Sequence, residues 1–74
     1  MPGTSLREIY VDLLLDRVRR ETFPNPDHLD RIEATVRSPE QIVEYVEVLL
    51  SKVEGMRYPS GAILDRIQRL AVIK

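Results

Sequence analysis

One stretch of the chain occurs twice, at a spacing of 35 residues. Residues 10–36 align without a gap against residues 45–71, and ten of the 27 aligned positions are identical. The shared residue types are Tyr, Val, Leu, Leu, Val, Pro, Leu, Asp, Arg and Ile. A repeat of this length suits a helix–loop–helix unit, which cannot bury its apolar side alone but can pack against a second copy. The sequence therefore predicts an all-α, internally duplicated chain.

Polar capping residues and prolines divide this chain into four predicted helices. The expected N-caps are Ser5, Asn25, Ser38 and Ser60. Ser5 is followed three residues later by Glu8, which is the spacing of a capping box, and Pro26 and Pro39 suit the first helical position. We expect repeat units over about 5–37 and 38–73 within one domain, 1–74. The second predicted helix runs from about 26 to 36.

Apolar residues recur at helical spacing and define one face of each predicted helix. The predicted core residues are Val11, Leu14, Leu15, Val18, Leu29, Ile32, Val46, Leu49, Leu50, Val53, Leu64 and Ile67. The core stripe of the third predicted helix matches that of the first, so we expect the same positions to be buried in both units. This pattern predicts a compact four-helix bundle with approximate internal two-fold symmetry.

Length and composition limit the classes of protein that this sequence can represent. The chain has 74 residues, no cysteine and a formal charge of −1. A domain this small has a marginal core, and without cysteine it has no disulfide or thiolate metal site to stabilise it. No apolar run approaches the roughly 18 residues of a membrane span. We expect a soluble, cytoplasmic protein, and nine Arg against two Lys suggest a GC-rich bacterial genome.

No sequence feature indicates catalysis. The chain has no Gly-rich phosphate loop and no nucleophile motif, and His28 is its only histidine. A tetrahedral zinc site would need carboxylates for every other ligand, so we expect His28 to be a half-buried packing residue. We therefore expect no enzymatic activity, no cofactor and no metal.

A basic patch on the fourth predicted helix leaves nucleic-acid binding as an alternative function. Its members are Arg66, Arg69 and Lys74. The third predicted helix is acidic, so the whole surface is dipolar rather than basic, and the net charge does not favour a polyanion. A nucleic-acid-binding regulator would read its target with the fourth helix.

The first predicted helix carries a second apolar face, opposite its core stripe. This face holds Leu6, Ile9 and Leu13, whereas the third helix has Gln41, Glu44 and Val48 at the aligned positions. An apolar strip with a polar rim is typical of an interface.

We therefore predict a protein–protein interaction or regulatory module that docks onto itself or onto a larger partner. The predicted interface residues are Leu6, Ile9, Tyr10, Leu13, Tyr45 and Val48, with the two tyrosines at its edges. The alternative is that Val72 and Ile73 cover this face within the same monomer.

Overall fold

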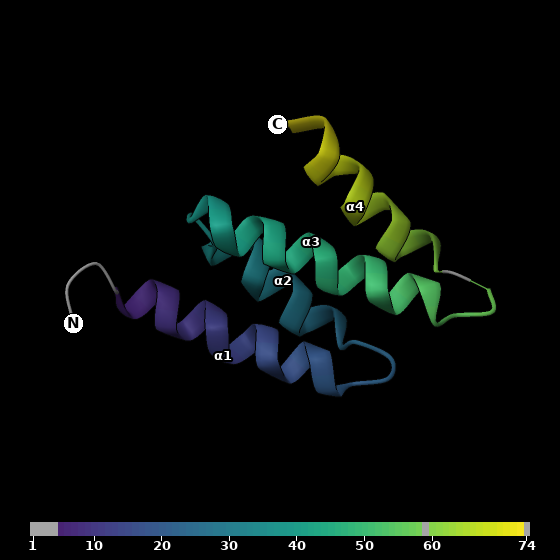
Figure 1. Cartoon of the computed structure of the whole chain (residues 1–74), viewed down its shortest axis with the longest axis horizontal. Coiled ribbons are helices and arrows are strands. Elements are labelled where there is room, and N and C mark those ends of the chain that lie inside the picture. Colours follow the sequence, from purple (N-terminus) through teal and green to yellow (C-terminus); the bar gives the residue numbers. More distant parts are fainter. Residues whose placement is uncertain (1–4, 59, 74) are drawn as a thin grey trace.

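The chain folds into four α-helices (Figure 1). The computed structural model describes residues 5–58 and 60–73, with Ile73 described by its backbone alone. The helices are α1 (Leu6–Arg20), α2 (Pro26–Thr35), α3 (Pro39–Glu54) and α4 (Gly61–Ile73). No strand occurs in these two described ranges, so the prediction of an all-α chain is confirmed.

Local capping explains where the helices begin. The Ser5 hydroxyl accepts a hydrogen bond from the Glu8 amide, and the Glu8 carboxylate accepts one from the Ser5 amide, both at 3.1 Å. Asn25 Oδ1 accepts from the Asp27 amide at 2.8 Å, and Ser38 Oγ accepts from the Gln41 amide at 3.4 Å. Each bond satisfies an amide that has no partner within its helix. The caps predicted for the first three helices are confirmed.

The helices α1 and α3 lie side by side and run in the same direction (Figure 1). Near their N-terminal ends, Gln41 Nε2 donates to the Glu8 carbonyl oxygen at 2.9 Å. Near their C-terminal ends, Lys52 Nζ donates to the Arg19 carbonyl oxygen at 2.8 Å. The helix α2 forms a hairpin with α1, and α4 forms a hairpin with α3. The second hairpin is therefore stacked on the first, with α3 in contact with α1 and α4 in contact with α3.

The core lies mainly between the two hairpins. Its buried apolar residues are Val11, Leu14, Leu15, Val18, Leu29, Ile32, Val36, Tyr45, Val48, Leu49 and Ile63. In the first hairpin, all six predicted core residues are buried. In the second hairpin, Leu49 is the one predicted core residue that is fully buried, whereas Leu50 and Leu64 are 44% and 45% exposed.

The core prediction was thus wrong for Leu50 and Leu64, because the side of α3 that faces the first hairpin is not the one that the alignment implied. Tyr45 and Val48, predicted at an interface, are 0% and 7% exposed. They occupy the side of α3 that covers the first hairpin. Val53 and Ile67 are partly buried against the edge of the core, and Val46 is half-buried.

No helix within the described ranges is both long enough and apolar enough to cross a membrane.

Candidate functional site

Four large side chains of α1 form an uncovered apolar face. Leu6, Ile9, Tyr10 and Leu13 are 84%, 53%, 38% and 63% exposed. They are separated by three or four residues and therefore lie on one side of the helix, away from Val11 and the rest of the core stripe. We call these four residues the outer α1 face.

No other described helix covers the outer α1 face. The helix α1 packs against α2 and α3, and α4 makes no contact with α1. Val72, which the sequence alternative placed over this face, is 76% exposed on α4. The side chain of Ile73, the second residue of that alternative, lies outside the described residues. Among the residues that the structure describes, none covers this apolar surface.

Charged groups of α1 and α2 border the outer α1 face. They surround a shallow hollow of about 650 Å³ lined by Tyr10, Leu13, Leu14, Asp16, Arg17, Arg20, Asp27, His28 and Arg31. Arg31 Nε and Asp27 Oδ2 form an ion pair at 2.8 Å. The Asp27 carboxylate, and next the Tyr10 hydroxyl, raise the pKa of Arg31. Tyr10 and Arg31 are therefore neighbours at this rim, one from each helix of the first hairpin.

Tyr45 is an internal residue and not the exposed interface anchor that the sequence predicted. Its hydroxyl donates to Glu33 Oε2 at 2.6 Å, which joins α3 to α2. Burial favours a side chain that satisfies its polar atom, and the Glu33 carboxylate provides that partner. Val48 is buried beside it on the same face of α3.

Glu33 is the centre of a polar cluster that links α2, α3 and α4. Arg66 Nη1 donates to Glu33 Oε2 at 2.7 Å, and Arg66 Nη2 pairs with Asp30 Oδ1 at 2.9 Å. Arg69 Nη2 lies 3.6 Å from Glu33 Oε1. The side chains of Arg66 and Glu33 are 12% and 20% exposed. Sequence reasoning missed this cluster, because its members lie on three different helices and no helical spacing relates them.

The same cluster changes the interpretation of the predicted nucleic-acid-binding residues. Arg66 is held by two carboxylates of α2 and is nearly buried, so it is not the exposed phosphate ligand that was predicted. The Arg69 side chain is 64% exposed. Lys74 lies outside the described residues.

The environment of Tyr45 predicts a loss of stability at alkaline pH. Burial, and next the Glu33 carboxylate, raise the pKa of Tyr45. An unfolded tyrosine ionises near pH 10, about its unperturbed value, whereas the folded protein retains this proton at higher pH. The free energy of unfolding should therefore fall as the pH rises above about 10.

Tyrosinate absorbance and far-ultraviolet ellipticity, followed together against pH, measure this effect. In the wild type, one of the three tyrosines should ionise only as helicity is lost. Tyr45→Phe should remove that step from the absorbance curve. Ionisation of the same tyrosine with helicity intact would contradict the assignment.

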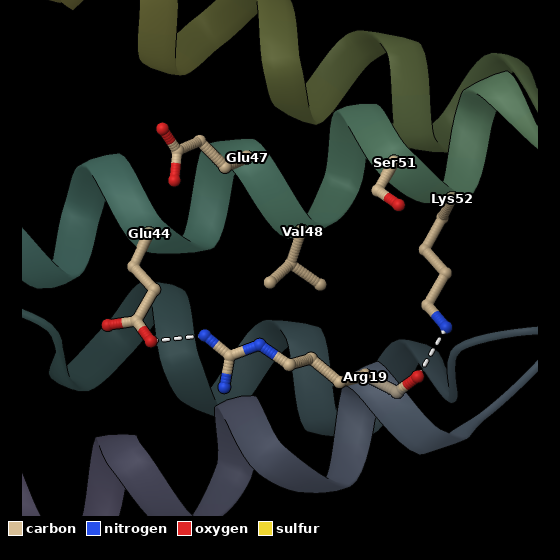
Figure 2. A pocket seen from close by; sticks show the side chains of 6 residues that line it. All are labelled: Arg19, Glu44, Glu47, Val48, Ser51 and Lys52. Atoms are coloured by element: carbon tan, nitrogen blue, oxygen red, sulfur yellow. Dashed lines mark hydrogen bonds and ion pairs between the residues drawn. The ribbon is translucent and has the colours of Figure 1, made fainter.

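A second hollow lies between α1 and α3 and has a volume of about 270 Å³ (Figure 2). Its lining residues are Arg19, Glu44, Glu47, Val48, Ser51 and Lys52. Figure 2 shows Arg19 reaching from α1 to form an ion pair with Glu44 of α3. Lys52 Nζ donates to the carbonyl oxygens of Arg19 and Glu21, at 2.8 and 2.5 Å. The ion pair and the two hydrogen bonds hold α3 against the C-terminal end of α1.

His28 is half-buried and pairs with a carboxylate. Its Nδ1 lies 3.2 Å from Glu21 Oε2. The Asn25 amide donates to the same carboxylate, and this bond, with a smaller contribution from His28, lowers the pKa of Glu21. Across residues 5–58 and 60–73, no group of three or more His, Cys, Asp or Glu side chains could hold a metal ion.

Comparison with known proteins gives no family for this chain. No family model matches the sequence, and no match was found among curated proteins or solved structures. The functional argument therefore depends on the surfaces described above.

Proposed function

We propose that this chain is a small non-enzymatic interaction module that docks through the outer α1 face onto a second copy of itself. The observation that supports the proposal is that Leu6, Ile9, Tyr10 and Leu13 are all exposed on one side of α1. Removing apolar surface from water contributes about 25 cal/mol per Å², so leaving four large side chains exposed is unfavourable. A polar rim around such a strip is typical of a contact surface.

A second copy suits this face because a domain of 74 residues has limited stability alone. Self-association adds buried apolar area without adding chain length. The rim carries both signs of charge, from Asp16 with Arg20 and from Asp27 with Arg31. A rim of mixed sign is compatible with an identical partner, whereas a single sign would repel its own copy.

The proposal also includes the repeat, with a modified relation between its two units. An internal two-fold axis would bury aligned positions equally in both hairpins. Instead Leu15 is fully buried and its counterpart Leu50 is exposed, while Tyr45 is fully buried and its counterpart Tyr10 is exposed. This pattern supports two copies of one unit stacked head to tail. The side of the second hairpin that holds Tyr45 packs on the side of the first hairpin that holds Leu15.

Leu13→Asp tests the docking face. This change places a charge in the centre of the outer α1 face at a site that is exposed in the monomer, so the fold should remain while association is lost. Sedimentation equilibrium over a wide concentration range, at two salt concentrations, should show association of the wild type with little salt dependence and a monomeric variant. Circular dichroism should show equal helicity.

Val72→Asp is the matched control for this experiment. Val72 is an exposed apolar residue of α4 that lies outside the outer α1 face. The control should associate as the wild type does. Equal loss of association in both variants would mean that the added charge, rather than the site, is responsible. Undiminished association of the Leu13→Asp variant would show that docking uses another surface.

A further inference from the structure

The second hairpin has an uncovered apolar face of its own. Its members are Val43, Val46 and Leu50 on α3 and Leu64, Ile67 and Ala71 on α4. On each helix these residues follow the spacing i, i+3, i+7, so they form one stripe per helix. Val43, Leu50, Leu64 and Ala71 are exposed, and Val46 and Ile67 are half-buried. We call these six residues the α3–α4 face.

The two stripes lie on the same side of the hairpin. On α4, Arg66 marks the flank that contacts α2, and Leu64 lies nearly half a turn away on the other flank. On α3, Tyr45 marks the side that covers the first hairpin, and Leu50, five residues later, lies about 140° away around the helix. The α3–α4 face is therefore the back of the second hairpin.

The helix α3 covers the back of the first hairpin, which is the side that aligns with the α3–α4 face. Residues that lie 35 positions before the α3–α4 face include Val11 and Leu15 on α1 and Leu29, Ile32 and Val36 on α2. All five are buried in the core that α3 completes with Tyr45, Val48 and Leu49. The back of the first hairpin is thus occupied, whereas the aligned surface of the second hairpin is empty.

The front of the first hairpin is the outer α1 face. Residues Leu6, Tyr10 and Leu13 align with Gln41, Tyr45 and Val48, the residues with which α3 docks. Of these two aligned sets, the α3 residues are buried and the α1 residues are exposed. Within the chain, the front of the second hairpin is therefore docked on the back of the first. Among the described residues, nothing covers the front of the first hairpin, which is the outer α1 face, or the back of the second hairpin, which is the α3–α4 face.

We infer that copies of this chain associate head to tail, with the outer α1 face of one copy docked on the α3–α4 face of the next. The new contact repeats the one that joins the two hairpins within a chain. This inference depends on the proposed function and adds the receptor surface to it.

The buried tyrosine contact has a polar counterpart in the new interface. Within the chain, the Tyr45 hydroxyl donates to Glu33. The aligned residues are Tyr10 of one copy and Gln68 of the next. The Gln68 side-chain oxygen can accept the same bond, because an amide oxygen is an acceptor as a carboxylate is.

The arginine contact also has its counterpart. Within the chain, Arg66 of α4 pairs with Asp30 of α2 at 2.9 Å. The aligned residues are Arg31 of one copy and Asp65 of the next, so the opposite charges are preserved. Tyr10 and Arg31 already line the same hollow at the rim of the first hairpin, just as Tyr45 and Arg66 both donate to Glu33.

The contact at the C-terminal end of α1 also has a counterpart in the proposed interface between copies. Lys52 donates to two carbonyl oxygens there, and the aligned donor is Arg17, which would reach the carbonyl oxygens of Glu54 and Met56. A cation at a helix C-terminus is favourable. At the other end, Gln41 lies on Glu8 in the chain, and the aligned pair is Leu6 on Val43, which replaces a polar contact by an apolar one.

Three internal contacts between polar side chains have no counterpart. The pair Arg19 and Glu44 aligns with Glu54 and Ile9, and the bond from Gln41 to Asp12 aligns with Leu6 and Glu47. The pair Arg69 and Glu33 aligns with Ala34 and Gln68, which cannot form an ion pair. The contact area of one helix face is on the order of 1,000 Å² in total, at the low end for specific interfaces. We therefore expect micromolar rather than nanomolar association.

The geometry of this contact determines the type of assembly. A head-to-tail contact uses two different surfaces, so each bound copy leaves a free front and a free back. The average mass of the wild type should rise with concentration past that of a dimer, as in a solenoid extended between molecules.

Two blocking variants and their mixture test the inference. Leu13→Asp disrupts the outer α1 face and leaves the α3–α4 face intact. Leu50→Asp disrupts the α3–α4 face and leaves the outer α1 face intact. Each variant alone should be monomeric in sedimentation. An equimolar mixture should form a 1:1 dimer that does not grow, because the front of the Leu50→Asp chain meets the back of the Leu13→Asp chain. The control Val72→Asp should assemble like the wild type.

The same experiment separates failure of the inference from failure of the proposed function. If Leu50→Asp associates like the wild type while Leu13→Asp is monomeric, the outer α1 face docks but its receptor is not the α3–α4 face. If the mixture stays monomeric although both variants are helical, the inference is also overturned. A wild type that is monomeric up to about millimolar concentration overturns both, since the expected affinity is micromolar. Leu6→Asp, at a more exposed site of the same face, replaces Leu13→Asp if that variant loses helicity.

Discussion

Replacing Glu33 by alanine is expected to lower the free energy of unfolding by about 2–4 kcal/mol, because it leaves the buried Tyr45 hydroxyl without a partner and Arg66 with Asp30 alone. The Tyr45 hydroxyl and the Arg66 guanidinium both donate to Glu33 Oε2, at 2.6 and 2.7 Å. Tyr45 is fully buried and the Arg66 side chain is 12% exposed, so water replaces the lost carboxylate poorly. A domain of this length has a total stability on the order of 4–11 kcal/mol, so the change removes a large share.

Urea denaturation followed by circular dichroism measures the effect. The control is Glu47→Ala, which removes an exposed glutamate of α3 and should change the stability by less than about 0.5 kcal/mol. A double-mutant cycle between Glu33→Ala and Tyr45→Phe isolates their shared hydrogen bond. Equal stability losses for Glu33→Ala and Glu47→Ala would show that the cluster around Glu33 contributes nothing to the fold.

The helices and their N-terminal boundaries could be predicted from the sequence because they depend on local chemistry. A cap such as Ser5 or Asn25 accepts a hydrogen bond from an amide two or three residues away, so it can be predicted from a few consecutive residues. The core stripe of α1 could be predicted for a similar reason. Its positions Val11, Leu15 and Val18 follow one helical face, and α2 and α3 both pack against that side.

The core of the second hairpin could not be predicted, because burial depends on what lies on the other side of each residue. Leu15 and Leu50 occupy aligned positions, but Leu15 is fully buried on the side of α1 that packs in the core, whereas Leu50 is 44% exposed. Tyr10 and Tyr45 show the reverse case. The alignment predicted the same buried positions in both hairpins. Because the hairpins stack, the Tyr10 side of the first and the Leu50 side of the second are the exposed ones.

The candidate site was partly predictable on the same grounds. A second apolar stripe on α1 can be recognised from spacing alone, and its three leucine and isoleucine residues are exposed. The cluster around Glu33 joins residues 12 and 33 positions apart, and no spacing rule relates them. Its one signal was the repeated Asp-Arg pair, whose arginine is exposed in the first unit, as Arg31, and nearly buried in the second, as Arg66.

The second large effect is a difference between two identical substitutions at aligned positions. Leu15→Ala should destabilise the fold by about 2–4 kcal/mol, because Leu15 is fully buried and its truncation leaves a cavity in the core. Leu50→Ala should cost less than about 1 kcal/mol, because its side chain is 44% exposed and little packing is lost. Both sites lie within helices, so the change in helix propensity is the same in the two variants.

Protein concentration decides how the comparison should be made. At concentrations well below the dissociation constant the chain is monomeric, and the two stabilities should differ by about 2 kcal/mol or more. At high concentration, docking on the α3–α4 face would cover Leu50, so the cost of Leu50→Ala should rise with concentration while that of Leu15→Ala should not. Equal costs at low concentration would mean that Leu50 is buried within the monomer. The back of the second hairpin would then not be free to receive another α1.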